Sequence, residues 1–317
     1  MKKTLYMAPI LGVTGSSYRN AYSRFFEGYD CAVLPFIKSS KGRRSTLNDI
    51  LPERNNARFK LIPQVLDKDP EYFIPVAKAI FDLGYDTLNW NLGCPLPMVR
   101  NKGRGSGMLP LLEEITAFLD KVLSKIPNRL SIKVRLGSTD NKALAKLLPR
   151  LNNFPLEEII IHPRTGKQMY KGEVDLDAFQ EALSLTKHTI VYSGDIDSVK
   201  TLKTLSKRFP RVNRWMIGRS GITDPFLPEE IRHITHYTDR EKLDRFLSFH
   251  AAVFAGYQKE LSGPAHLIGK MKEVWRYWAD AFEGGNRLFF KITRTKTVKT
   301  YLLTVSDFFA THPNLNI

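Results

Sequence analysis

The sequence predicts a (β/α)8 barrel, a TIM barrel, that is followed by a small all-helical C-terminal domain. Eight short apolar segments recur between residues 5 and 218, and most are rich in Val, Ile and Leu. Such runs are typical of parallel strands that are buried on both faces. Segments with helical periodicity lie between them, and this α/β alternation is the pattern of a barrel. The expected strands are Leu5–Pro9, Cys31–Ile37, Leu61–Val65, Asp86–Asn91, Leu130–Leu136, Glu158–His162, Thr189–Ser193 and Arg214–Gly218.

The helices between the strands are predicted by apolar residues at positions i, i+3, i+4 and i+7. One of them follows Asp69-Pro70, a pair that favours a helix start. A further helix is expected roughly over 46–56. The apolar positions of the others are Phe73, Val76, Ala77 and Ile80; Leu111, Ile115, Phe118 and Val122; Leu144, Leu147, Leu148 and Leu151; and Val199, Leu202 and Leu205.

A doubly wound sheet is the alternative architecture, and it should carry a glycine fingerprint between its first strand and helix. Here the corresponding turn, 8–15, reads Ala-Pro-Ile-Leu-Gly-Val-Thr-Gly, which is not such a fingerprint. The G-x-G-x-G of 103–107 does not open a helix in the right context either. The barrel is therefore favoured.

The pattern changes after about residue 238, where strands cease and helical spacing continues. We expect a catalytic barrel domain over 1–238 and a helical domain over 239–317. A helix that begins near Asn286 carries a positive stripe formed by Arg287, Lys291 and Arg294. Such a stripe is often only a solvated helix face, but in a basic protein it can also contact a polyanion.

The charge balance points to nucleic acid as a partner. Among 317 residues, 48 Lys and Arg face 32 Asp and Glu, which gives a net charge of +16. A balance this basic favours nucleic acid, with solubility or an anionic membrane surface as alternatives. Hydrophobic residues make up 43% of the chain, which is enough for a sizeable core.

Several protein classes do not fit the sequence. Two cysteines, Cys31 and Cys94, cannot form an extracellular disulfide framework, and neither has the spacing of a zinc site. No stretch has the pattern of a signal peptide or a membrane span. We expect a cytoplasmic protein, a monomer without an obligate protein partner, and no metal.

Polar residues end the expected strands, and chemistry in a barrel sits at those carboxyl ends. Lys133 and Arg135 share one face of their strand because side chains alternate with period two. A buried Lys, an amide and a His on neighbouring strands are costly for packing alone. The ends in question carry Gln64, Asn91, Cys94, Lys133, His162, Ser193 and Gly218.

Two further features suggest a ligand. The backbone N–H groups at Gly194 and at Gly218-Arg219 follow the seventh and eighth strands, where such barrels commonly bind phosphate. Cys94 lies between Gly93 and Pro95, just before a glycine-rich basic loop. We interpret Cys94 as a group that handles a proton and the loop as a polyanion contact. The alternative for Cys94 is an inert buried thiol, and Cys31 is assigned to the core.

The segment Asn91-Leu92-Gly93-Cys94-Pro95, with the loop 103–107, resembles the active-site signature of the flavin-dependent tRNA-dihydrouridine synthases. Further segments resemble this family in the same order along the barrel, and the family also has a C-terminal helical domain. The stretch 266–282 is most similar to the bacterial C-type members. The further segments are Met7-Ala8-Pro9, Lys133-Val134-Arg135, His162-Pro163-Arg164-Thr165 with Tyr170 and Gly172, and Gly218-Arg219.

The resemblance implies that FMN lies across the top of the barrel and that NADPH, or NADH, recharges it. It also implies that C6 of a flipped-out uracil in tRNA receives a hydride from the flavin N5, while C5 receives a proton from Cys94. The residues implied to bind the cofactor are Pro9, Ile10, Leu11, Gln64, Lys133, His162, Ser193, Gly194, Asp195, Gly218 and Arg219.

The resemblance also implies two sets of substrate contacts. The uracil is expected to contact Asn91, Arg135, Lys38 and Arg164. The RNA backbone is expected to meet basic residues after the second and fourth strands and on the last helices, namely Lys41, Arg43, Arg44, Arg100, Lys102, Arg104, Arg287, Lys291 and Arg294.

The sequence departs from the family pattern in three places. Residues 10–15 read Ile-Leu-Gly-Val-Thr-Gly, where the family more often has Met-Glu-Gly-Val-Thr-Asp. The seventh strand ends Ser193-Gly194-Asp195 and not Asn-Gly, and Pro35 lies where an acidic residue is usual. The first and third departures bear on flavin seating and uracil contact.

The chemistry supports the same assignment. Reduction of the uracil 5,6 double bond needs a hydride, which no side chain donates, and so it requires a cofactor. The proton donor must be protonated at pH 7, and an unperturbed thiol with a pKa of about 8.5 qualifies. Three alternatives stay open: an FMN oxidoreductase for a free pyrimidine-like molecule, an aldolase with a Schiff base on Lys133, and a non-catalytic tRNA-binding homologue.

Overall fold

The computed structural model describes residues 3–38, 44–233, 237–311 and 313–317. Its centre is one sheet of parallel strands, and each of the eight predicted apolar segments contributes to it. The strands are β1 (Thr4–Met7), β2 (Cys31–Val33), β3 (Ile37–Lys38), β4 (Lys60–Ile62), β5 (Gln64–Leu66), β6 (Thr87–Leu92), β7 (Arg129–Arg135), β8 (Ile159–His162), β9 (Ile190–Ser193) and β10 (Arg214–Ile217).

The sheet closes into a barrel because two of the predicted strands are interrupted and pair with each other. The strand order is β3-β5-β6-β7-β8-β9-β10-β1-β2-β4, so β3 and β4 stand at its two ends. β2 pairs with β4 and β3 pairs with β5, while Pro35 and Pro63, which lack an N–H group, lie at the breaks. The (β/α)8 architecture is therefore confirmed.

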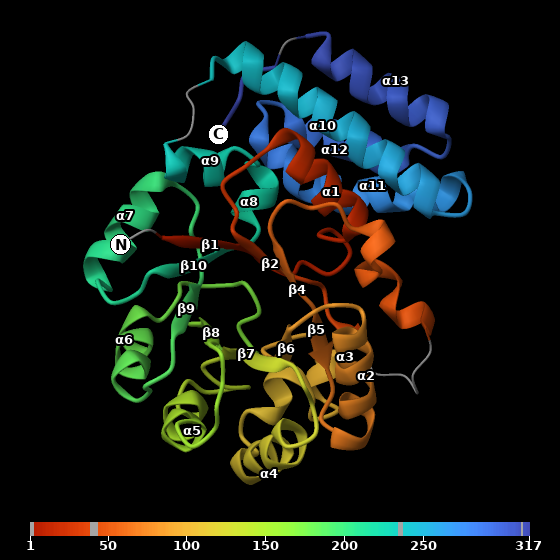
Figure 1. The fold of residues 1–317 in the computed structure, drawn as a ribbon. Coiled ribbons are helices and arrows are strands. Elements are labelled where there is room, and N and C mark those ends of the chain that lie inside the picture. The colour runs from red at the N-terminus through yellow and green to blue at the C-terminus, as the bar shows by residue number, and fades with distance from the viewer. Residues whose placement is uncertain (1–2, 39–43, 234–236, 312) are drawn as a thin grey trace.

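Helices surround the barrel on its outside, as Figure 1 shows. Trp90 points outward from β6, and its ring stacks on Phe118 with 3.9 Å between ring centroids. The helices that cover the barrel and its loops are α1 (Ser16–Phe25), α2 (Pro70–Asp82), α3 (Pro97–Arg100), α4 (Leu112–Leu123), α5 (Ala143–Leu151), α6 (Leu176–Ser184), α7 (Val199–Arg208), α8 (Ser220–Thr223) and α9 (Leu227–Arg232).

The α-helix expected over 46–56 is wrong. Two 3-10 helices, η1 (Arg44–Ile50) and η2 (Pro52–Arg54), occupy this region. Pro52 disfavours helical backbone at the residue before it, and Leu51 is extended with ψ 131°. The carboxylate of Asp49 also accepts a hydrogen bond from the N–H of Ser16 at the start of α1, at 2.6 Å, and this contact holds the segment in its observed conformation.

The C-terminal region is entirely helical, with α10 (Asp239–Glu260), α11 (Pro264–Trp278), η4 (Ala279–Ala281), α12 (Gly285–Arg294) and α13 (Val298–Phe309). A capping box at Thr238 and Glu241 starts α10. These helices lie against α1, where Phe249 meets the ring of Tyr18 edge-on at 5.4 Å. Trp275 and Trp278 are fully buried. Within the described ranges, no helix has both the length and the apolar character needed to cross a membrane.

A buried polar chain joins three of the C-terminal helices. The indole N–H of Trp275 on α11 donates to the Tyr301 hydroxyl oxygen on α13 at 2.9 Å. That hydroxyl lies within hydrogen-bond distance of Nε2 of His250 on α10, at 2.6 Å. Burial lowers the pKa of His250 to about 4.

We predict that acid destabilises this region through His250. Below pH 6.5 the unfolded chain binds a proton at this residue, whereas the folded chain resists it until about pH 4. The free energy of unfolding should fall by roughly 3 kcal/mol over this interval. Urea titrations at several pH values should show this loss in the wild type and in the exposed control His266→Gln. In His250→Phe the loss should be smaller by about this amount, with the part due to buried His162 remaining, and an unchanged pH dependence in that variant would contradict the account.

Candidate active site

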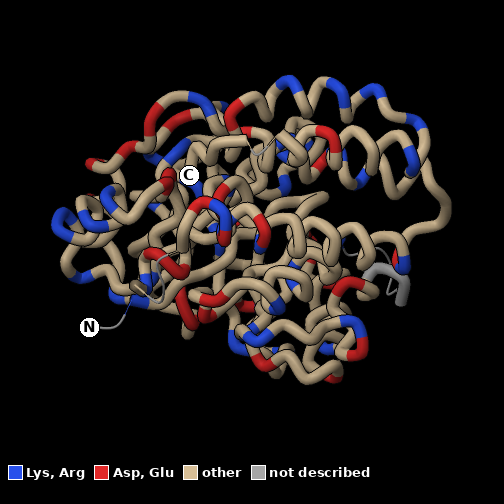
Figure 2. The backbone as a smooth tube through the Cα atoms, turned by 90° about the horizontal axis from the view of Figure 1, so that it is seen from above, with Lys and Arg blue, Asp and Glu red and all other residues tan. Residues whose placement is uncertain are grey.

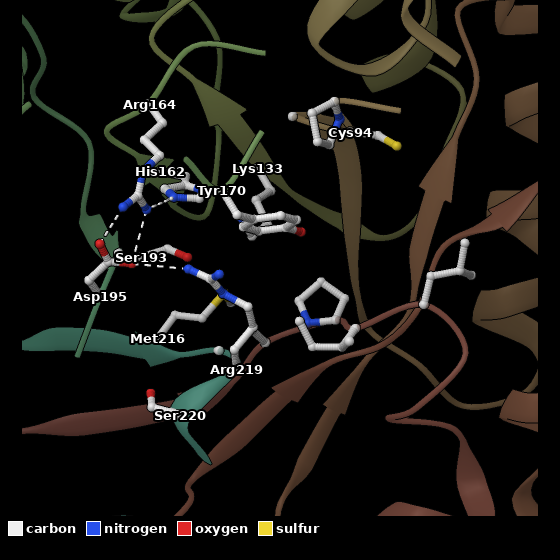
Figure 3. Close-up of a pocket in the computed structure, with 18 of the residues that line it drawn as sticks. Cys94, Lys133, His162, Arg164, Tyr170, Ser193, Asp195, Met216, Arg219 and Ser220 are labelled. Atoms are coloured by element: carbon white, nitrogen blue, oxygen red, sulfur yellow. Dashed lines mark hydrogen bonds and ion pairs between the residues drawn. The ribbon is translucent and has the colours of Figure 1, made fainter. Parts of the chain in front are cut away.

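A cavity of about 910 Å³ opens at the carboxyl ends of the strands. Figure 3 shows side chains from several strands converging on it. Lys38, at the end of β3, is exposed and does not line the cavity. The predicted residues that do line it are Pro9, Ile10, Leu11, Gln64, Asn91, Cys94, Lys133, Arg135, His162, Arg164, Ser193, Gly194, Asp195, Gly218 and Arg219.

A buried hydrogen-bonded network forms part of the cavity floor. Ser131 accepts from Nδ2 of Asn89 at 2.7 Å, and Oδ1 of Asn89 accepts from Nε2 of Gln64 at 2.7 Å. Oε1 of Gln64 accepts from Nδ2 of Asn91, also at 2.7 Å. Each amide is therefore oriented by its neighbours, and the rotamer of Gln64 is fixed before any ligand arrives.

Asn91 also shapes the turn that presents Cys94. Its Oδ1 accepts the backbone N–H groups of Gly93 at 3.0 Å and of Cys94 at 2.8 Å. The side chain expected to hold a substrate thus has a second task, which is to fix the end of β6. Its contact with uracil stays a prediction.

Cys94 is a buried thiol with an exposed fraction of 7%. Burial raises its pKa, and this outweighs the opposing effects of the Leu96 backbone N–H and the nearby cations Arg135 and Lys38. The side chain therefore stays protonated at neutral pH. Cys31 lies at the amino end of β2, and burial raises its pKa to about 11.

Burial and crowded positive charge set the protonation of two strand residues. Burial, followed by the charge of Arg135, lowers the pKa of Lys133 to about 7. Burial, followed by Arg135 and Lys133, lowers the pKa of His162 well below its ordinary value. His162 is thus neutral, and its Nε2 accepts from Nη1 of Arg164 at 3.2 Å.

Arg164 holds one wall of the cavity and does not extend freely into it. Its guanidinium is 2% exposed, pairs with Asp195 (Nη1 to Oδ1, 3.0 Å) and donates to the carbonyl of Gly172 at 2.7 Å. Arg219 pairs with the same carboxylate at 3.4 Å. Burial opposes the ionised form of Asp195, but the Arg164 guanidinium lowers its pKa overall. These contacts give Arg164 an ordering role; its expected contact with substrate stays untested.

Several residues that line the cavity were not predicted from the sequence. Tyr170, noted only as part of a motif, has its ring 5.4 Å from the Arg135 guanidinium and 4.7 Å from that of Arg219. Met216 lies on β10, and Arg276, Tyr277 and Asp280 come from the helical region. The sequence carries only an indirect indication of the residues from α11. Trp275 and Trp278 are buried, so Arg276 and Tyr277 between them lie on the opposite face of that helix.

The ends of β9 and β10 fit a phosphate. Among the described residues, no hydrogen bond uses the backbone N–H of Gly194 or of Arg219. A Cβ at Gly194 would come within 3.0 Å of the Tyr192 hydroxyl and 3.1 Å of Val174, so any larger residue there would force these neighbours to shift. Arg219 adds a cation beside these donors. Free N–H groups with an adjacent guanidinium suit the phosphate of a flavin nucleotide.

The described residues that are expected to contact RNA do not line the cavity. Lys102 is exposed, whereas the Arg104 guanidinium lies 3.6 Å from the fully buried carboxylate of Asp67. On α12, Arg287, Lys291 and Arg294 are exposed. Figure 2 shows Lys and Arg spread over the chain and interspersed with Asp and Glu. Arg100 is half-buried. Lys41, Arg43 and the side chain of Arg44 lie outside the described residues, and every RNA contact stays a prediction.

The barrel, the cavity at its carboxyl ends and the phosphate-type cradle fit a flavin-dependent oxidoreductase. Over residues 6–307 the chain matches the sequence pattern described as "Dihydrouridine synthase (Dus)". The chain belongs to the dihydrouridine synthase family.

Individual relatives agree with this assignment. The tRNA-dihydrouridine synthase B of Vibrio parahaemolyticus is 25% identical over 234 residues, which are 74% of this chain and 72% of the relative. A probable tRNA-dihydrouridine synthase of Helicobacter pylori is 27% identical over 248 residues, 74% and 71% of the two chains. One of the two relatives named here is a B-type enzyme, and the C-type likeness of 266–282 stays a prediction.

Solved structures support the fold alone. A morphinone reductase variant in complex with tetrahydroNAD has a TM-score of 0.53 and 11% identity, and covers 74% of this chain and 87% of its own. A variant of NCR from Zymomonas mobilis has the same TM-score and identity, with 74% and 88% covered.

We predict that Asn89→Ala lowers the free energy of unfolding by about 3 kcal/mol. The change leaves the buried Nε2 of Gln64 without its acceptor and removes a donor to Ser131. Urea unfolding should give no more than about 0.5 kcal/mol for the control Asn141→Ala, whose exposed amide bonds Asp175. Equal losses in the two variants would show that the floor network is not stabilising.

We also predict that one lysine titrates near neutrality. NMR of protein with ¹³C-labelled lysine should show Lys133 changing charge at about pH 7, cationic below and neutral above. Arg135→Met should raise that midpoint because a neighbouring cation is removed, while burial keeps it below the ordinary value of about 10.4. A Lys133 signal that titrates with the surface lysines in both proteins would refute this.

Proposed function

We propose that this protein reduces a specific uridine of tRNA to 5,6-dihydrouridine, with FMN as its cofactor and NADPH (or NADH) as the reductant. The observation that carries the proposal is a protonated thiol, Cys94, lining the same cavity as the cradle at Gly194 and Arg219. Both relatives named above carry tRNA-dihydrouridine synthase in their names.

The residues that would hold FMN come from most strands of the barrel. The N–H groups of Gly194 and Arg219 and the Arg219 guanidinium would bind its phosphate, next to Ser193, Asp195 and Gly218. Gln64, Lys133 and His162 would meet the polar edge of its ring, and Pro9, Ile10 and Leu11 would bound it on the other side. When bound, the flavin supplies the hydride that protein side chains cannot donate.

Cys94 would give the Sγ proton to C5 of the uracil. The hydrogen added at C5 would thus come from the protein, and the hydride added at C6 would come from the flavin. A general acid must carry its proton at the working pH, and the burial that raises the pKa of Cys94 ensures this. Arg135 and Asn91 line the same cavity and would hold the uracil, with Lys38 near its rim. The neutral Nε2 of His162 is already used by Arg164, which keeps its ring in one orientation.

The tRNA would reach the site by unstacking the target base. This costs a few kcal/mol, which phosphate contacts can offset in a protein with a net charge of +16. We assign these contacts to Arg100, Lys102 and Arg104 of the barrel domain (1–238) and to Arg287, Lys291 and Arg294 of the helical domain (239–317). Monomeric state and cytoplasmic location stay predictions.

We predict that Cys94→Ala slows dihydrouridine formation by 10²- to 10⁴-fold, the usual contribution of a general acid. The assay uses flavin-loaded protein, NADPH and unmodified tRNA, with dihydrouridine measured by mass spectrometry. Cys31→Ala is the matched control and should keep the wild-type rate. Wild-type activity in Cys94→Ala would sink the proton-donor role. Rapid reduction of a free pyrimidine would favour a small-molecule oxidoreductase, and tRNA binding without product would favour a non-catalytic homologue.

A further inference from the structure

The glycine-rich segment 103–107 packs directly against Cys94. The basic, glycine-rich sequence of this segment predicts a polyanion contact, but Gly105 and Ser106 are buried in η3 (Gly105–Met108). Ser106 has no exposed surface, so its hydroxyl cannot face RNA or solvent. The position of Ser106 against Cys94 therefore needs another explanation.

Ser106 binds the carbonyl oxygen of Cys94 twice. Its backbone N–H donates to this oxygen at 3.1 Å, and its Oγ–H donates to the same oxygen at 3.0 Å. On the other side of Cys94, the backbone N–H donates to Oδ1 of Asn91 at 2.8 Å. The backbone of Cys94 is therefore held at both its N–H and its C=O, and the direction of its Cα–Cβ bond is fixed.

Close packing adds to these hydrogen bonds. Gly105 has φ +55°, and a Cβ there would lie 2.8 Å from both the Cβ and the carbonyl oxygen of Cys94. Gly166, in the loop after β8, lies behind the serine, since a Cβ at that position would come within 2.3 Å of the Ser106 Oγ. Two glycines thus let two loops close on the residue pair Cys94 and Ser106.

The segment is also anchored at its start. The Arg104 guanidinium lies 3.6 Å from Oδ1 of Asp67, which is fully buried just after β5. The same oxygen accepts the N–H groups of Lys68 at 2.7 Å and Asp69 at 3.0 Å. This pairing holds the chain that leads into Ser106 against a neighbouring strand.

We propose that Ser106 is a positioning residue for Cys94: its two hydrogen bonds to the Cys94 carbonyl aim the thiol into the cavity. The inference rests on the proposed function, in which Cys94 donates the proton. General acid catalysis is sensitive to the placement of the donor, and small displacements of a catalytic group can cost up to about 10²-fold in rate. Ser106→Ala removes one of the two bonds and leaves the backbone N–H in place.

The test separates the two half-reactions of the flavin-loaded protein. Anaerobic stopped flow should show that Ser106→Ala leaves flavin reduction by NADPH within about twofold of wild type but slows reoxidation by unmodified tRNA about tenfold. In a Cys94→Ala background the same change should have no further effect, because Ser106 acts through the thiol. Ser23→Ala, which removes another buried serine hydroxyl with one backbone partner, controls for general destabilisation and should leave both rates unchanged.

A tenfold effect that persists in the Cys94→Ala background would overturn the proposal, as would wild-type reoxidation in Ser106→Ala. If the flavin of Cys94→Ala is reoxidised by tRNA at the wild-type rate, the proposed function fails. The positioning role is then tested separately, by the rate at which the Cys94 thiol is alkylated. In the Cys31→Ala protein, Ser106→Ala should change the rate of iodoacetamide reaction at Cys94 several-fold and alter its pH profile, because the thiol is no longer held in one orientation toward the cavity. An unchanged alkylation rate and profile would refute the positioning role independently of catalysis.

Discussion

The rest of the site depends on the hydrogen bonds made by the carboxamide of Asn91. It ties the end of β6 to the turn at Gly93 and Cys94 through Oδ1, and it ties β6 to β5 by donating to Gln64. Buried polar groups need partners, and here each amide on the floor satisfies the next one. The position of the thiol and the orientation of the floor are therefore set by a single connected network that belongs to the barrel itself.

Electrostatics then decides which groups carry protons. Lys133, Arg135, Arg164 and Arg219 gather around the cavity, and the carboxylate of Asp195 pairs with two of them. Burial and nearby positive charge together keep His162 neutral and lower the pKa of Lys133 to about 7. Burial raises the pKa of Cys94 and keeps it a thiol. The result is a cavity that attracts an anionic ligand and retains one proton to give away.

Sequence alone could predict the barrel and most of the cavity, because apolar runs define strands and polar residues at their ends meet at one rim. It could not predict the roles of these residues in packing. Ser106 and Gly166 meet only through the fold, and α11 brings Tyr277 to the cavity from a distant part of the chain. The α-helix expected over 46–56 does not form, because Pro52 disfavours helical backbone at the residue before it and this outweighs the apolar spacing.

The most direct test of the account is an absorption spectrum of the purified protein during anaerobic turnover. The account predicts two flavin bands that bleach on adding NADPH and recover on adding unmodified tRNA, but not on adding free uridine. A protein that remains colourless after incubation with FMN would contradict a flavin site at Gly194 and Arg219. Recovery with free uridine at the same rate as with tRNA would contradict the assignment of tRNA as substrate.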